Sequence, residues 1–167
     1  MELRRLTSKD LDSYFANRLR ALQNAPSAFL TTYEEEKAGG NVFFKETLAH
    51  DGNQKAIFGA VVDGVVVGTI GIYREERPKV SHKAMIWGMY VDTKHRNKKI
   101  AGKLLDLAID FAKNDMKVEV VGLSVESGNE SAKQLYESRG FKTWGVEPKA
   151  MKSGTDFFDE VHMVLYL

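Results

Sequence analysis

Cationic side chains are concentrated in one short segment that leads into a strongly amphipathic stretch. Lys94, Arg96, Lys98, Lys99 and Lys103 fall within ten positions. The apolar residues that follow recur at helical spacing, so these cations lie at the start of a helix. Lysine is unusual there, because unpaired backbone N–H groups and the positive end of the helix dipole favour an anion. The pattern indicates either a phosphate-binding site or a solvated basic surface, and the spacing alone favours neither.

A second group of candidate residues lies between positions 129 and 141. Asn129 is placed to cap a short helix, Tyr136 lies on the apolar face of that helix, and Gly140 is placed to end it. A cap and a half-buried aromatic ring explain both side chains structurally. A tyrosine hydroxyl, however, has a reference pKa of about 10, so it also holds a proton at neutral pH that it can donate.

The elements that must position these residues alternate between strand and helix. Val- and Ile-rich runs on either side of Asp63-Gly64 predict a β-hairpin within residues 56–73, and the apolar spacing from Ile100 to Lys113 predicts a helix. The pattern indicates an α/β domain with a mixed sheet. The other expected strands are 3–6, 84–91, 118–125, 141–146 and 157–167, and the other expected helices are 11–22, 33–48 with a weak point at Gly39-Gly40, and 129–140.

Length and composition exclude several classes of protein. The chain has 167 residues, no cysteine and a net charge of +1. The length predicts a single domain, 1–167. The absence of cysteine excludes disulfides and thiol nucleophiles, and the near-neutral charge argues against a nucleic-acid partner. The four histidines show no metal-ligand spacing, so we expect no metal. No apolar run reaches about 20 residues, so we expect a cytoplasmic protein without a membrane partner.

Taken together, residues 91–103 and 129–141 resemble the GCN5-related N-acetyltransferase (GNAT) superfamily. The second segment matches the pattern Asn-x-x-Ala-x-x-Leu-Tyr-x-x-x-Gly-Phe at every position. The first matches Arg/Gln-x-x-Gly-x-Gly/Ala at Arg96 and Ala101, but Lys99 stands in place of the glycine. The order of elements also looks like the family from end to end. The resemblance implies a mixed, mostly antiparallel, twisted sheet of about seven strands, with two parallel central strands splayed apart and about four flanking helices.

The resemblance also implies acetyl-CoA as the cofactor, bound between the strands that end at Val91 and Val125. Backbone N–H groups of residues 97–101 would hold the pyrophosphate, and main-chain groups of the preceding strand would hold the pantetheine arm. Lys99 would either hinder the approach of the pyrophosphate or supply a cation to it. The implied cofactor-binding residues are Met89, Tyr90, Val91, Arg96, Asn97, Lys98, Lys99, Ile100, Ala101, Asn129 and Tyr136.

For the reaction, the resemblance implies direct attack of a primary amine on the thioester within a ternary complex. The acceptor would be a small molecule or a peptide, and Tyr136 would be the general acid for the leaving thiolate. Many family members carry a glutamate on the strand before the pyrophosphate loop, but residues 81–91 contain no carboxylate. His82, Glu126 or a chain of water molecules therefore remain as candidates for the base.

The family usually builds its acceptor wall from the first two helices and their connecting loop, here residues 24–36. The implied substrate-binding residues are Phe29, Thr31, Tyr33 and Glu34. A homodimer is also implied. The alternative function is a non-catalytic acyl-CoA sensor or regulatory module of the same fold, which Lys99 and the missing strand glutamate favour. The intact Asn129 and Tyr136 favour the enzyme.

Overall fold

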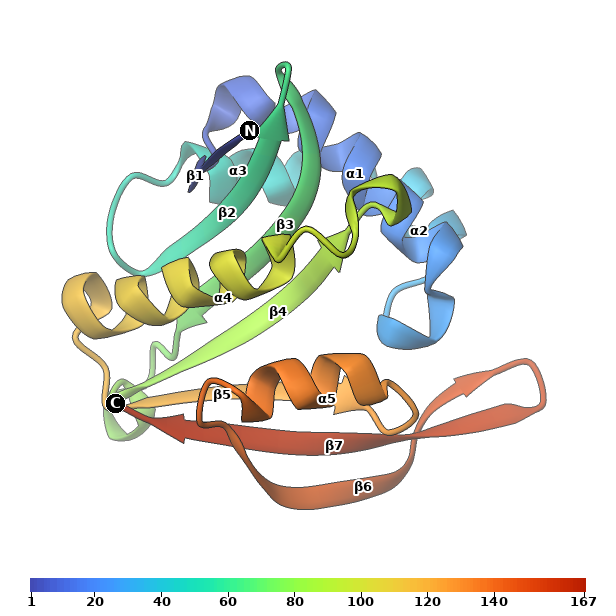
Figure 1. Ribbon diagram of the computed structural model, residues 1–167, viewed down its shortest axis with the longest axis vertical. Helices are drawn as coiled ribbons and strands as arrows, with labels where there is room; N and C mark the ends of the chain where they lie inside the picture. The colour runs from blue at the N-terminus through green and yellow to red at the C-terminus, as the bar shows by residue number, and fades with distance from the viewer.

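The computed structural model describes all 167 residues, which form one seven-stranded sheet with helices on both faces (Figure 1). The strands are β1 (Glu2–Arg5), β2 (Lys55–Val62), β3 (Val65–Arg74), β4 (Lys83–Val91), β5 (Val120–Glu126), β6 (Lys142–Ser153) and β7 (Asp156–Tyr166). The helices are α1 (Leu11–Asn24), α2 (Tyr33–Gly39), α3 (Val42–Ala49), α4 (Ile100–Phe111) and α5 (Glu130–Glu137). Short 3-10 turns, among them η2 (Pro26–Ala28) after α1 and η4 (Thr93–His95) before α4, connect them.

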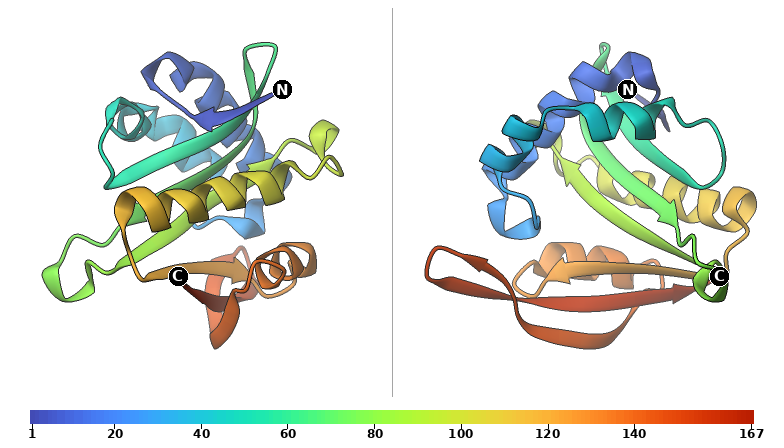
Figure 2. Two further views of the ribbon diagram at one scale, coloured as in Figure 1. Left: turned by 60° about the vertical axis from the view of Figure 1, so that its left-hand side comes forward. Right: turned by 180° about the vertical axis from the view of Figure 1, so that it is seen from behind.

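The strands lie in the order β1-β2-β3-β4-β5-β7-β6, and only β4 and β5 run parallel. Their pairing is limited to three positions, from Lys83 opposite Val120 to Met85 opposite Gly122. Beyond these positions the two strands separate, as Figures 1 and 2 show: they lie together beside the C-terminus and diverge away from it. The predicted mixed, mostly antiparallel sheet with a splayed parallel pair is confirmed.

Each face of the sheet buries a separate apolar core. The larger core packs α4 and α5 against the sheet and includes Leu104 and Leu105, both fully buried. The smaller core packs α1 and α3 against the opposite face and includes Tyr14 and Phe44, whose rings meet edge to face at 5.1 Å. Coverage on both faces explains why β2 and β3 are apolar at nearly every position.

Local turn chemistry fixes the predicted hairpin, whereas the helix count differs from the expectation. Asp63 and Gly64 have φ values of 50° and 78°, the left-handed pair that a two-residue hairpin turn requires. The single helix expected over residues 33–48 is two helices, because Gly40 has a φ of 69° and ends α2. The flanking helices are therefore five, not four. None of them is long and apolar enough to cross a membrane.

The helix predicted from Ile100 to Lys113 continues through Asn114 and Asp115. After Phe111 the chain widens into a π-helical turn, Ala112–Met116, which buries Met116. Lys117 then adopts a left-handed conformation with a φ of 53° and stops the helix. Burial of the methionine side chain thus outweighs the local preference of Asn and Asp for a turn.

Candidate active site

A cleft of about 610 Å³ opens where β4 and β5 separate. Beyond Met85 and Gly122 the facing edges of the two strands no longer pair, so their main-chain polar groups are available to a ligand. The cleft passes through the sheet. Its lining includes α4 and α5 from the face of the larger core and the turn after α1 from the opposite face.

A β-bulge shapes the β4 wall of the cleft. The register with β3 shifts between Thr69, which pairs with Tyr90, and Gly71, which pairs with Trp87, so β4 carries one extra residue there. Gly88 supplies the necessary left-handed conformation with a φ of 63°. The bulge bends the wall that presents Met89 and Val91. A glycine inside a strand pattern is the sequence signal for such a feature, and our sequence analysis missed it.

The N-terminus of α4 forms the cationic end of the cleft. Lys99 is the N-cap residue, yet its side chain makes no capping hydrogen bond, and the first turn contains no acidic residue. The first backbone N–H groups of α4 therefore have no partner within the helix and are open to an anion. Arg96 donates from Nε to the Val91 carbonyl at 3.2 Å, which ties its guanidinium group to the mouth of the cleft.

The conformation of Lys99 explains why the family pattern has glycine at this position. Lys99 has a φ of 58° and Asn97 a φ of 63°, so both are left-handed. A left-handed conformation costs a side-chain-bearing residue about 1 kcal/mol, whereas glycine adopts it freely. The chain retains the required backbone and adds an ammonium group beside the helix N-terminus. This combination of free N–H groups, helix dipole and cations fits a diphosphate.

Tyr136 contributes a side chain with a hydroxyl group to the cleft lining. The side chain lies on α5, is 6% exposed, and donates a hydrogen bond to Sδ of Met89 at 3.3 Å. A thioether sulfur is a weak acceptor, so the O–H group remains free to serve a stronger one. Burial raises the pKa of Tyr136 to about 12, so the hydroxyl keeps its proton throughout the neutral range.

Asn129 is both a helix cap and part of the cleft wall. Its Oδ1 accepts a hydrogen bond from the backbone N–H of Ala132 at 3.2 Å and fixes the start of α5. The cap uses the oxygen, so the amide N–H₂ is the group with which Asn129 could reach a ligand.

Most of the predicted cofactor-binding residues line the cleft together. They are Met89, Tyr90, Val91, Arg96, Asn97, Lys99, Ile100, Ala101, Asn129 and Tyr136. Lys98 is the exception: it is exposed and lies outside the lining. The aromatic ring of Tyr90 is buried, and its hydroxyl accepts a hydrogen bond from Nδ2 of Asn24 at 2.8 Å, so this side chain anchors the end of α1 to β4.

The opposite face of the cleft is walled by aromatic and polar side chains from several elements. Phe29 follows the η2 turn, and the guanidinium group of Arg18 stacks on its ring at 4.8 Å. Trp87 fits because Gly71 has no side chain: a Cβ atom there would lie 2.2 Å from Cε2 of the indole. Ser124 and Glu126 complete this wall from β5. Of these residues, sequence analysis named only Phe29 and Glu126.

The remaining predicted acceptor residues lie elsewhere. Thr31, Tyr33 and Glu34 are outside the cleft lining, because the chain turns away after Phe29 into α2. The neighbouring acidic residues stabilise α2 and its packing. Glu35 forms a capping box with Thr32 at the start of α2, and Glu36 forms an ion pair with Arg18 of α1 at 3.2 Å.

The two candidate bases are at opposite ends of the parallel pair. His82 precedes β4 at its closed end, where its carbonyl accepts the N–H groups of Glu119 and Val120. Gly88 lies six positions further along the chain, roughly 20 Å away at about 3.3 Å per residue. The structure therefore does not bring His82 to the cleft. Glu126 does line the cleft, and its carboxylate accepts the backbone N–H of Gly128 at 2.7 Å.

Comparisons with known proteins agree with this arrangement. The family model described as the acetyltransferase (GNAT) family matches residues 16–141. The L-amino acid N-acetyltransferase AaaT of Escherichia coli is 25% identical over 145 residues, which cover 87% of this chain and 88% of that protein. The N-alpha-acetyltransferase of Saccharolobus solfataricus is 35% identical over 123 residues, which cover 70% and 72%. YncA of Salmonella typhimurium, solved with its cofactor acetyl-CoA, superposes with a TM-score of 0.85 at 18% identity over 99% of this chain and 93% of that one. The chain therefore belongs to the GNAT family of acetyltransferases, whose acetyl donor is acetyl-CoA.

Proposed function

We propose that this protein transfers the acetyl group of acetyl-CoA directly to a primary amine within a ternary complex. The observation that carries the proposal is the cleft that passes through the sheet between β4 and β5. The cationic N-terminus of α4 lines the cleft on one face of the sheet, and the turn after α1 lines it on the other face. A donor that enters from the first face and an amine that enters from the second would meet between the strands, so no covalent intermediate on the protein is required.

The residues of the first face are assigned to the cofactor. Acetyl-CoA supplies the activated acetyl thioester. The uncapped N–H groups of α4, with Arg96 and Lys99, would hold its diphosphate. Main-chain groups of Met89 and Val91 would orient the pantetheine arm, because β4 has no pairing partner on this edge. Asn129 would add its amide group from the start of α5.

Tyr136 is assigned to the leaving sulfur, as a hydrogen-bond donor. A thiol has a reference pKa of about 8.5, whereas burial raises the pKa of Tyr136 to about 12. Complete transfer of the phenolic proton to a thiolate would be uphill by about 3.5 pKa units, or about 5 kcal/mol. A hydrogen bond to the developing negative charge needs no such transfer and replaces the weak bond to Met89. This refines the general-acid role expected from the sequence.

The acceptor is proposed to carry an α-amino group. Two relatives support this, since one is named for L-amino acids and the other for N-alpha acetylation. The aromatic side chains of Phe29 and Trp87 would contact the organic part of the acceptor, and Glu126 would favour its ammonium group. The acceptor would be a free amino acid or the first residue of a peptide.

Release of CoA thiol, measured across free amino acids, short peptides and diamines, tests the proposal. We expect turnover with at least one α-amine and a product heavier by one acetyl group in mass spectrometry. Calorimetric titration with acetyl-CoA is measured in parallel. Tight binding without turnover of any amine would replace the enzyme by the acyl-CoA sensor, and absence of binding would exclude both.

The proposal extends to a cytoplasmic protein that forms a homodimer. Exposed aromatic side chains on the last two strands support association, since Trp144 is 69% exposed and Phe157 is 49% exposed. Light scattering at micromolar concentration tests the dimer. A monomer mass across the concentration range would exclude it.

A further inference from the structure

A chain of three hydrogen-bonded side chains leads away from the cleft along one face of the sheet. Ser124 on β5 lines the cleft, and its Oγ lies 2.8 Å from Nδ1 of His162 on β7. Nε2 of the same imidazole lies 3.3 Å from Oε2 of Glu147 on β6. Ser124 and His162 are direct cross-strand partners, so the strand register holds them together.

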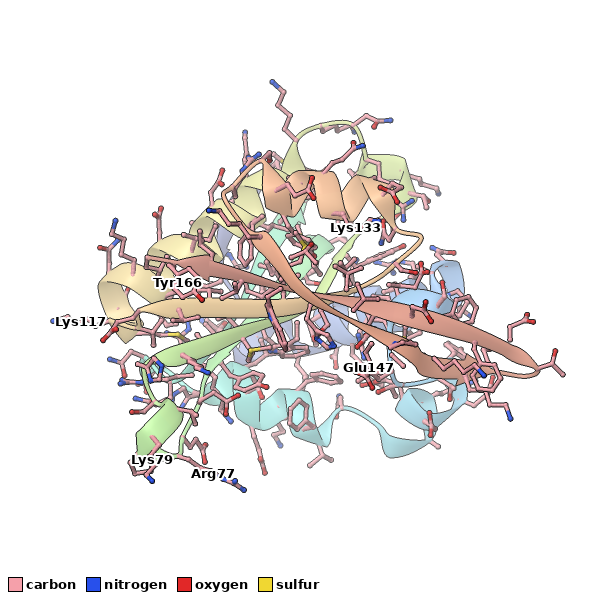
Figure 3. All side chains as sticks on the ribbon, turned by 90° about the horizontal axis from the view of Figure 1, so that it is seen from below. Arg77, Lys79, Lys117, Lys133, Glu147 and Tyr166 are labelled. Carbon is pink, nitrogen blue, oxygen red and sulfur yellow. The ribbon has the colours of Figure 1, made fainter.

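The chain begins on the face of the cleft assigned to the acceptor. Leu123 and Val125, the neighbours of Ser124 on β5, are buried in the core under α4 and α5. Ser124 therefore points to the opposite face, because side chains alternate along a strand. Figure 3 shows Lys133 of α5 and Glu147 of β6 on opposite sides of the β6–β7 ribbons, with Glu147 toward α2 and α3. The chain thus runs along the face on which the amine would enter.

We propose that Ser124 and His162 form the route by which the acceptor ammonium group loses its proton. The inference rests on the proposed N-acetyltransferase function and assigns the base that this proposal leaves open. Ser124 would contact the amine, and His162 would take the proton through the Ser124 hydroxyl. The Glu147 carboxylate can only accept a hydrogen bond, so Nε2 of His162 is the nitrogen that carries the ring proton. Nδ1 is then unprotonated and accepts a hydrogen bond from the serine O–H group.

The proton count closes with these groups. The ammonium group gives one proton to Oγ of Ser124 as the serine proton passes to Nδ1 of His162. The neutral amine then forms the C–N bond while the C–S bond breaks and its electron pair goes to sulfur. The nitrogen loses a second proton as it becomes an amide, and that proton neutralises the thiolate beside Tyr136. The first proton leaves to solvent from the imidazolium ion, which is partly exposed.

Carboxylates lie close to His162 on the acceptor face of the sheet. Ligand-type atoms of Glu147, Glu160 and His162 lie within 4.8 Å of one another, and Glu126 is the cross-strand partner of Glu160. Two carboxylates, Glu147 of β6 and Glu160 of β7, thus lie beside the imidazole. The ring of Trp144 packs beside it, with ring centroids 5.3 Å apart. An incoming ammonium group is stabilised by this negative charge.

Steady-state kinetics against pH test the route in Ser124→Ala, His162→Gln and the charge control Glu76→Gln, which removes an exposed carboxylate outside the cleft. We expect wild-type kcat to fall as the pH drops, because a protonated His162 accepts no proton. Ser124→Ala and His162→Gln should each lower kcat about tenfold at pH 7, where only about one tenth of an α-amine is neutral. The deficit should shrink as the pH rises toward the pKa of the amine, about 8 for an α-amino group, because the free amine then needs no base. Glu76→Gln should retain the wild-type profile.

Two further measurements separate this inference from the proposed function. Acetyl-CoA affinity should be unchanged in Ser124→Ala and His162→Gln, and added imidazole should partly restore His162→Ala. Nitrogen-15 NMR of the histidine rings should show His162 protonated at Nε2 and unprotonated at Nδ1, a result that requires no turnover. An Nδ1-protonated tautomer, or variants that keep kcat within threefold and an unchanged pH profile, would overturn the route. Wild-type protein without activity on any amine would overturn the proposed function itself.

Discussion

Replacement of Tyr136 by phenylalanine separates its role at the reacting sulfur from its role in the fold. The hydroxyl is buried and has only the weak thioether acceptor of Met89, so Tyr136→Phe leaves no strong polar group unsatisfied. The free energy of unfolding should change by less than about 1 kcal/mol, or about 4 °C in Tm. Loss of one preorganised donor to a developing charge lowers kcat about 100- to 1,000-fold. Thiol-release kinetics and thermal unfolding of the same preparations check both values.

The pH dependence of the wild type gives an independent test of the same group. Burial raises the pKa of Tyr136 to about 12, so the hydroxyl is lost only as the pH rises through that value. Wild-type kcat should therefore show no basic limb from this group up to pH 10. Tyr166→Phe, an exposed tyrosine outside the cleft, is the matched control and should behave as the wild type. A Tyr136→Phe variant with kcat within threefold of wild type, or a basic limb near pH 10 that only this variant loses, would refute the reasoning.

Three further substitutions test separate parts of the structure. Lys99→Gly removes a cation from the N-terminus of α4, so calorimetry should show a CoA affinity about two- to fivefold weaker at low salt. The same change removes the strain of a left-handed lysine, and the free energy of unfolding should stay within about 1 kcal/mol of wild type. Gly71→Ala places a Cβ atom 2.2 Å from Trp87 and should raise the KM of the amine about tenfold while the Kd of acetyl-CoA stays constant. Arg4 binds Asp10 at 2.7 and 2.8 Å and lowers the pKa of that carboxyl from 3.8 to about 2. This ion pair adds about 2 kcal/mol to the free energy of unfolding above pH 3.8, and this contribution disappears as the pH falls through 2. Urea unfolding of Asp10→Asn should therefore show a lower stability than wild type at pH 7 and no difference below pH 2.

The parts of the fold that could be predicted from the sequence are those with a local cause. The Asp63-Gly64 turn carries its own left-handed preference, and α4 shows its buried face in its apolar spacing. The π-helical turn after α4 has no such signal, because the burial of Met116 against distant residues decides it. The same holds for the strand order, since β7 inserts between β5 and β6 through a long hairpin.

The two halves of the candidate site differ in the same way. The cofactor half consists of two continuous segments, each a strand end followed by a helix start, and its chemistry could be predicted from residue spacing. The acceptor half takes single residues from distant segments. Ser124 and His162 are 38 positions apart and meet only because β7 pairs with β5. The sequence leaves His82 among the candidate bases, because it does not show at which end β4 and β5 separate. In the structure they separate at the far end, so His82 lies where the two strands are paired.

This division implies that the two specificities of the protein are separable. The α4 N-terminus and Tyr136 belong to elements packed on one face, whereas Phe29, Trp87 and Ser124 approach the cleft from the other. The β4 bulge at Gly88 lies between them and is the structural feature that both halves share. Changes at Phe29 or Trp87 should therefore alter the choice of amine at constant acetyl-CoA affinity. A change that removes the bulge should impair both together, because it moves the wall against which donor and acceptor meet.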